Sequence, residues 1–213
     1  MKKTILFDLD GTLLDTLKDL TIAVNYMLTH YNRPHRTEQE VRSFLGNGAM
    51  KLIELSYGQA LTKEALKEVY DYYDAYYQAH SMVYTKPYNG ILELLSYLSS
   101  KGYQMAVISN KQDAAVKALV DLLFPNLFEL SVGVKADQIK KPDPRMIESV
   151  LKELNAIREN TILIGDSEVD IMTGKNANVD VIACLWGFRD MKEIAPLKPE
   201  FIVSNPLDIK KIL

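Results

Sequence analysis

Short apolar runs alternate with helical patterns along most of this chain, and this alternation constrains the fold more than any other feature. Strands are predicted over residues 4–7, 104–108, 131–134, 161–164, 179–183 and 201–203. Helices are predicted to begin near residues 89, 111, 143 and 168. Alternating strands and helices build a parallel sheet with helices on both faces. The predicted fold class is therefore α/β.

A helical block from about residue 15 to residue 82 interrupts the alternation. Thr37 and Glu40 have the spacing of a capping box, so a helix is expected to begin there. Another helix is expected over residues 62–81, after the break at Gly46-Asn47-Gly48. The block predicts a helical insert at residues 15–82 within a sheet domain formed by residues 1–14 and 83–213.

The composition excludes several classes of protein. Hydrophobic residues make up 47% of the 213 residues and charged residues 25%, as in ordinary globular proteins. The net charge of −3 does not suit a broad nucleic-acid surface. Asp8 and Asp10 interrupt the first apolar run, which argues against a signal peptide, and the single cysteine, Cys184, suits a reducing compartment. We expect a cytoplasmic protein with neither nucleic-acid nor membrane partners.

Acidic residues follow two of the predicted strands. Asp8 and Asp10 come after the first strand, and Asp166 and Asp170 come after the strand at 161–164. Either segment alone could be a turn or a helix start. In open α/β sheets, however, ligands bind beyond the carboxyl ends of the strands, so the four carboxylates are expected at one place. Their mutual repulsion and their hard oxygen atoms predict a divalent cation, Mg²⁺ before Zn²⁺.

Two further segments carry groups suited to an anion. Ser109-Asn110-Lys111 follows a strand and is expected at the first turn of a helix, where backbone N–H groups bind anions. Lys140-Lys141-Pro142-Asp143-Pro144 is a loop that two prolines stiffen, and it could hold one lysine inward. A helix cap and a solvated basic loop are the simpler alternatives.

Taken together, these motifs resemble those of the haloacid dehalogenase-like hydrolases, most closely the phosphoglycolate phosphatase-like branch. The matching segments occur in the family's order and span essentially the whole chain: Asp8-Leu9-Asp10-Gly11-Thr12-Leu13, Ser109-Asn110-Lys111, Lys141-Pro142-Asp143-Pro144 and Gly165-Asp166-Ser167-Glu168-Val169-Asp170. The resemblance implies a Rossmann-like three-layer core with a small α-helical cap, inserted after the first strand.

The resemblance also implies a mechanism and a set of site residues. Asp8 is expected to be the nucleophile that forms an aspartyl-phosphate, and Asp10 the general acid and base. Mg²⁺ is expected on the side chains of Asp8 and Asp166 and on the backbone carbonyl of Asp10, with support from Asp170. The phosphate-binding residues are expected to be Ser109, Asn110 and Lys141, with Lys141 preferred over Lys140 because it directly precedes Pro142.

The implied activity is Mg²⁺-dependent hydrolysis of a small phosphorylated metabolite, with a phosphoglycolate-type substrate first. A sugar-phosphate mutase similar to β-phosphoglucomutase, a pyrophosphatase and a nucleotidase stay open as alternatives, and so does a non-catalytic binding protein. Mutases of this kind often carry an acidic pair at the fourth motif, whereas Gly165 precedes Asp166 here. The sequence does not distinguish a monomer from a homodimer.

Overall fold

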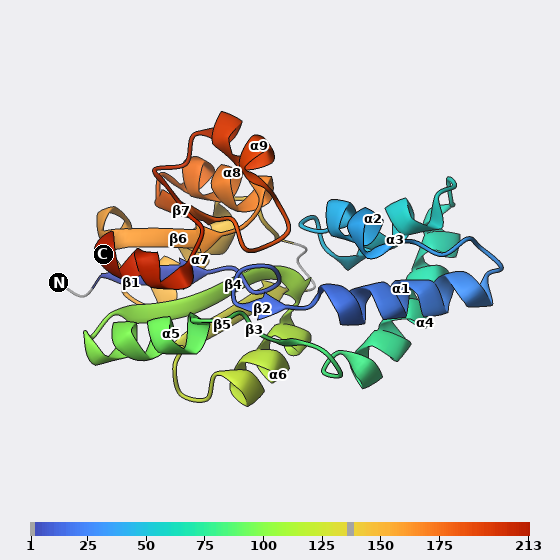
Figure 1. The fold of residues 1–213 in the computed structure, drawn as a ribbon, viewed down its shortest axis with the longest axis horizontal. Helices are drawn as coiled ribbons and strands as arrows, with labels where there is room; N and C mark the ends of the chain where they lie inside the picture. The colour runs from blue at the N-terminus through green and yellow to red at the C-terminus, as the bar shows by residue number, and fades with distance from the viewer. Residues whose placement is uncertain (1–2, 136–138) are drawn as a thin grey trace. The chain divides into compact units, whose positions relative to one another are not determined.

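The computed structural model describes residues 3–135 and 139–213, which divide into two compact units (Figure 1). The first unit runs up to Leu14 and resumes at Pro87–Leu213, and the second comprises Asp15–Lys86. The chain passes between the units at two short strands that pair with each other, β2 (Leu14–Asp15) and β3 (Lys86–Pro87). Among the described helices, none has both the length and the apolar character needed to cross a membrane.

The first unit is built on a six-stranded sheet in the order β5-β4-β1-β6-β7-β8. The strands are β1 (Thr4–Phe7), β4 (Gln104–Gln112), β5 (Leu130–Val134), β6 (Thr161–Gly165), β7 (Asp180–Cys184) and β8 (Phe201–Val203). Every neighbouring pair is parallel, and Phe7 of the central strand lies opposite Val107 and Ile164. The predicted α/β fold class is confirmed.

Helices cover both faces of this sheet (Figure 1). Ile5 and Phe7 point to the face that packs against α5 (Ile91–Ser100), α6 (Asp113–Leu123) and the 3₁₀-helix η3 (Pro206–Lys211). Leu6 points to the opposite face, against α7 (Arg145–Glu153), α8 (Glu168–Ala177) and α9 (Met191–Ile194). Because both faces are buried, the strands read as continuous apolar runs.

The boundaries around β4 differ from the prediction. A helix was expected from residue 111, but β4 continues to Gln112 and α6 begins at Asp113. The register with β5 shifts between Ile108 and Gln112, so the intervening residues form a bulge. Gly133 of β5 allows it, because a Cβ there would lie 2.5 Å from the Lys111 carbonyl oxygen. The expectation that Ser109-Asn110-Lys111 lies on the first turn of a helix is therefore wrong.

Smaller boundary differences occur at two other helices. Helix α5 begins at Ile91 after Gly90, whose φ of 88° suits glycine, and not after Asn89 as expected. Helix α7 begins at Arg145, so Pro144 occupies the N-cap position and not the first helical position.

The second unit is helical, as the sequence predicted. It contains α1 (Leu17–His30), α2 (Glu38–Phe44), α3 (Ala49–Tyr57) and α4 (Lys63–His80). The capping box between Thr37 and Glu40 is present at the start of α2. Tyr73 and Tyr77 of α4 are buried and stack on each other, with their ring centroids 5.7 Å apart.

One buried carboxylate ties the start of this unit to its end. Asp19, on the first turn of α1, accepts hydrogen bonds from the backbone N–H groups of Tyr84 and Thr85 and from the Thr85 hydroxyl. The segment that returns to β3 is thus held against the helix that leaves β2.

Candidate active site

Three carboxylates meet at the carboxyl ends of β1 and β6. Asp8 follows β1, Asp166 follows β6, and Asp170 lies on the first turn of α8. The two strands are neighbours, and the Asp8 N–H donates to the Ile164 carbonyl oxygen at 2.9 Å. All three side chains are buried, and one oxygen of each lies within 4.8 Å of the others. The sheet thus brings Asp8 together with two carboxylates that lie more than 150 residues further along the chain.

Lys141 is the cation that lies among these carboxylates. Its Nζ donates to Asp8 Oδ1 at 2.5 Å and to Asp170 Oδ1 at 2.6 Å, and only 3% of the residue is exposed. Lys140 is exposed. The proline-flanked loop therefore directs the second of the two lysines inward, as the sequence analysis preferred.

Burial and mutual repulsion dominate the electrostatics of the cluster. Burial, with the charges of Asp170 and Asp166, raises the pKa of Asp8 well above its ordinary value although Lys141 lowers it. Burial and the neighbouring Asp170 raise the pKa of Asp166 to about 7, against the opposing effect of the Phe188 N–H. Burial alone would lower the pKa of Lys141, but Asp170 and Asp8 raise it above its usual value. The cluster is thus short of positive charge.

Hydrogen bonds from neighbouring groups fix the orientation of the Asp166 and Asp170 carboxylates. Asp166 accepts from the Phe188 N–H at 2.7 Å and from the Thr12 hydroxyl at 3.2 Å. Asp170 Oδ2 accepts from the N–H and hydroxyl of Ser167, which in turn caps α8. Neither Thr12 nor Phe188 was expected to have a role at the site. Thr12 lies in the first motif, but nothing local in the sequence marks a backbone N–H that follows β7.

Asp10 lies outside the group of three carboxylates. Its side chain pairs with Lys111, whose Nζ lies 3.1 Å from Asp10 Oδ1 and 3.0 Å from Oδ2. This ion pair is largely buried, with 9% of the lysine side chain and 20% of the aspartate side chain exposed. The assignment of the Asp10 backbone carbonyl as a metal ligand stays a prediction.

The bulge in β4 supplies the remaining candidate residues. Ser109 is buried, and its hydroxyl accepts from the Lys111 N–H at 3.2 Å. The Asn110 side chain exchanges two hydrogen bonds with the backbone of Lys141, at 3.0 Å and 2.8 Å. Asn110 therefore holds the segment that carries the inward lysine.

The side chains fit a hard divalent cation. Asp8, Asp166 and Asp170 offer three convergent oxygen atoms, and one lysine cannot neutralise three carboxylates. Neither histidine nor cysteine belongs to this group of described residues. Oxygen-only donor sets favour Mg²⁺, Ca²⁺ or Mn²⁺ over softer metals.

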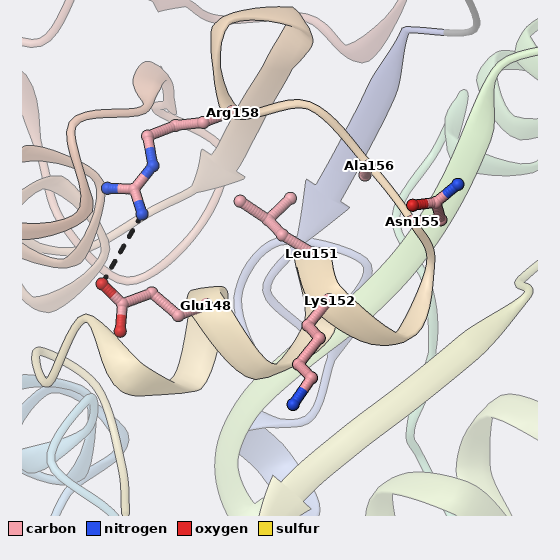
Figure 2. A pocket seen from close by; sticks show the side chains of 6 residues that line it. All are labelled: Glu148, Leu151, Lys152, Asn155, Ala156 and Arg158. Carbon is pink, nitrogen blue, oxygen red and sulfur yellow. Dashed lines mark ion pairs between the residues drawn. The ribbon is translucent and has the colours of Figure 1, made fainter.

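A pocket of about 300 Å³ lies elsewhere, beside α7 and the segment that leads to β6 (Figure 2). Glu148 and Arg158 form an ion pair on its wall, with N and O atoms 3.6 Å apart. None of the candidate site residues lines it. The concentration of buried charge therefore favours the carboxylate cluster as the functional site.

Comparisons with known proteins identify the family of the chain. The model of the haloacid dehalogenase-like hydrolase family matches residues 5–184. A phosphoglycolate phosphatase from Aquifex aeolicus is 33% identical over 99% of this chain and 96% of its own length. One from Colwellia psychrerythraea is 33% identical, over 94% of this chain and 92% of its own length.

Solved structures show the same similarity. The chain matches a crystal structure of a protein from Lactobacillus delbrueckii subsp. bulgaricus with a TM-score of 0.93 and 33% sequence identity. The match covers 100% of this chain and 98% of the other. A predicted phosphoglycolate phosphatase from Haemophilus somnus has a TM-score of 0.90 and 28% identity, covering 99% and 97%. The Rossmann-like core implied by the motifs is therefore confirmed. By sequence and by fold, the chain belongs to the haloacid dehalogenase-like hydrolase family and to its phosphoglycolate phosphatase-like branch.

Proposed function

We propose that this hydrolase is a Mg²⁺-dependent phosphatase that cleaves a small phosphate monoester through an aspartyl-phosphate, with a phosphoglycolate-type substrate. The observation that carries the proposal is the buried group of Asp8, Asp166, Asp170 and Lys141, with a second acid, Asp10, two residues after Asp8. Phosphate monoesters hydrolyse extremely slowly in water, so a phosphatase needs a positioned nucleophile, a proton donor and positive charge.

The two acids of the first motif divide the chemistry between them. A carboxylate oxygen of Asp8 attacks the phosphorus atom, and the bond from phosphorus to the leaving oxygen breaks as Asp10 gives that oxygen a proton. A water molecule then attacks the phosphorus of the aspartyl-phosphate and loses a proton to Asp10. Phosphate departs, and the Asp8 carboxylate and the Asp10 acid are both restored.

The other residues supply charge and position. Asp8, Asp166 and the Asp10 backbone carbonyl would hold Mg²⁺, with support from Asp170, and the bound ion would offset the negative charge of the carboxylates and the phosphate. Lys141 adds a fixed positive charge beside Asp8. Ser109 contributes a buried hydroxyl for a phosphate oxygen, and Asn110 assists indirectly by holding the Lys141 backbone.

The curated relatives support the choice of substrate. The relatives from Aquifex aeolicus and Colwellia psychrerythraea are both named phosphoglycolate phosphatases. We assign the helical unit the role of a cap that selects the substrate. This unit corresponds to the insert predicted at residues 15–82. A cytoplasmic location suits such a metabolite and the single, buried cysteine.

The surroundings of Gly165 favour a phosphatase over a mutase. A Cβ at this position would lie 2.3 Å from Asp170 Cβ. This backbone therefore leaves no space for the acidic pair that such mutases often carry at the fourth motif.

The first test is release of inorganic phosphate from 2-phosphoglycolate, with and without Mg²⁺. We expect turnover that EDTA abolishes and added Mg²⁺ restores. A panel containing pyrophosphate, a nucleoside monophosphate and β-glucose 1-phosphate, the last with a bisphosphate activator, tests the alternatives. Conversion of the sugar phosphate to its isomer at a higher rate than phosphate release would favour the mutase. Metal binding without turnover of any ester would indicate a binding protein.

A second test uses the thermal stability of the metal-free protein. The pKa of Asp166 is about 7 in the folded protein and lower in the unfolded chain, so the folded state holds more protons between these values. The contribution of Asp166 to stability should therefore fall as the pH rises from about 4 to about 7. Above pH 7, Mg²⁺ at 100 times its Kd should add about 2.7 kcal/mol, or roughly 5–11 °C in Tm, and the same Mg²⁺ concentration should add less at pH 5. An Mg²⁺-induced gain in Tm that is as large at pH 5 as above pH 7 would contradict the electrostatic account of the cluster.

A further inference from the structure

We propose that Lys111 is the positioning residue for Asp10, and that its ammonium group holds the Asp10 carboxyl group in the direction from which it gives the leaving group its proton. This inference rests on the proposed function. It adds a residue outside the phosphate- and metal-binding sets and assigns it to one half of the reaction.

The side chains of Lys111 and Asp10 are in direct contact. Lys111 Nζ is almost equidistant from the two Asp10 oxygens, at 3.1 and 3.0 Å. An exposed lysine and aspartate gain little from pairing, because solvent screens them. Here the lysine side chain is only 9% exposed, so the contact fixes the direction of the carboxyl group more strongly.

The backbone around Lys111 departs from a regular strand. The β4 bulge begins after Ile108 and ends at Gln112, and it replaces regular pairing with β5. Bulges redirect side chains and are common beside active sites. Two hydrogen bonds hold the β4 bulge in place. Ser109 Oγ accepts from the Lys111 N–H, and Asp113 Oδ1 accepts from the Gly133 N–H. The sheet and these hydrogen bonds therefore determine where the Lys111 backbone lies.

The partners of Asp10 decide which half of the reaction benefits. In the first half, Asp10 must point at the leaving oxygen of a bound ester to give it a proton. In the second half, its partner is a water molecule, which can adjust its own position. Lys111 should therefore matter most for leaving groups that need a proton.

The test compares two leaving groups in Lys111→Met. 2-Phosphoglycolate releases glycolate, whose alkoxide oxygen needs a proton, whereas 2,4-dinitrophenyl phosphate releases a phenolate that does not. We expect kcat for phosphoglycolate to fall about 10- to 100-fold, part of the usual contribution of a general acid. The kcat for the dinitrophenyl ester should stay within about threefold, and the KM values should change little. Lys117→Met removes an exposed lysine from its pair with Asp113 and serves as the matched control, with neither substrate affected.

A double-mutant cycle separates positioning from direct phosphate binding. If Lys111 acts through Asp10, adding Lys111→Met to Asp10→Asn should cause no further loss with phosphoglycolate. Additive losses, an equal loss for both esters, or no loss at all would overturn the inference. If the methionine variant does not fold, Lys111→Gln replaces it in the same cycle with the same criteria. A wild-type chain that hydrolyses neither ester would refute the proposed function itself, and the inference with it.

Discussion

Replacing Asp8 with asparagine should lower kcat for 2-phosphoglycolate by about 10⁴-fold or more, because the side-chain amide is a far weaker nucleophile than a carboxylate. The variant has nearly the same shape as the wild type. It also removes one of three buried acids that repel one another, and the pKa of Asp8 is raised by burial and by these neighbours. We therefore expect the Tm of metal-free Asp8→Asn, at about pH 7.5, to equal or exceed that of the wild type.

Two measurements make this prediction specific. Steady-state phosphate release gives kcat, and mass spectrometry of acid-quenched wild type should find a phosphoryl adduct on the peptide that contains Asp8 and none in the variant. Asp208→Asn, which changes an exposed carboxylate paired with Lys211, is the control and should keep full activity. Retained turnover in Asp8→Asn, or an adduct on another residue, would reject the nucleophile assignment.

Replacing Lys141 with methionine should produce the largest combined loss of activity and stability. The lysine is buried between Asp8 and Asp170, and its removal leaves both carboxylates without their cation. Breaking a buried ion pair from one side costs about 3–5 kcal/mol, which corresponds to a Tm lower by roughly 6–20 °C for a chain of this size. Turnover should fall by at least about 10²-fold, because the charge that offsets the phosphate is lost.

The pH dependence of this loss has a definite sign. The cluster carboxyls with raised pKa values, Asp8 and Asp166, take up protons as the pH falls. The uncompensated charge in Lys141→Met therefore shrinks, so the stability lost should be smaller at about pH 5 than at about pH 7.5. Urea unfolding without metal at both pH values measures the difference. Lys140→Met removes the exposed neighbouring lysine and should be nearly neutral. Equal destabilisation by the two substitutions would contradict the structural account of Lys141.

Much of the core could be predicted from local patterns. Helix α8 and strand β8 have their predicted bounds, and β1 is confirmed residue for residue. The capping box at Thr37 identified the start of α2 because it depends on residues only three positions apart. The prediction for the residues after Ile108 was wrong. Ser109, Asn110 and Lys111 are polar and suit the start of a helix, whereas pairing with β5 keeps them in strand β4.

The sequence by itself determined the alternation of strands and helices, the acids that end β1 and β6 and the family to which they belong. Each of these features depends on residues that are close together in the chain. Only the tertiary structure decided which groups pair, namely Lys141 with Asp8 and Asp170, Lys111 with Asp10, and the Phe188 N–H with Asp166. The physical reason is range. Backbone propensity acts over a few residues, whereas the partner of a buried charge is chosen by the sheet that brings distant segments together and by the cost of leaving that charge unpaired.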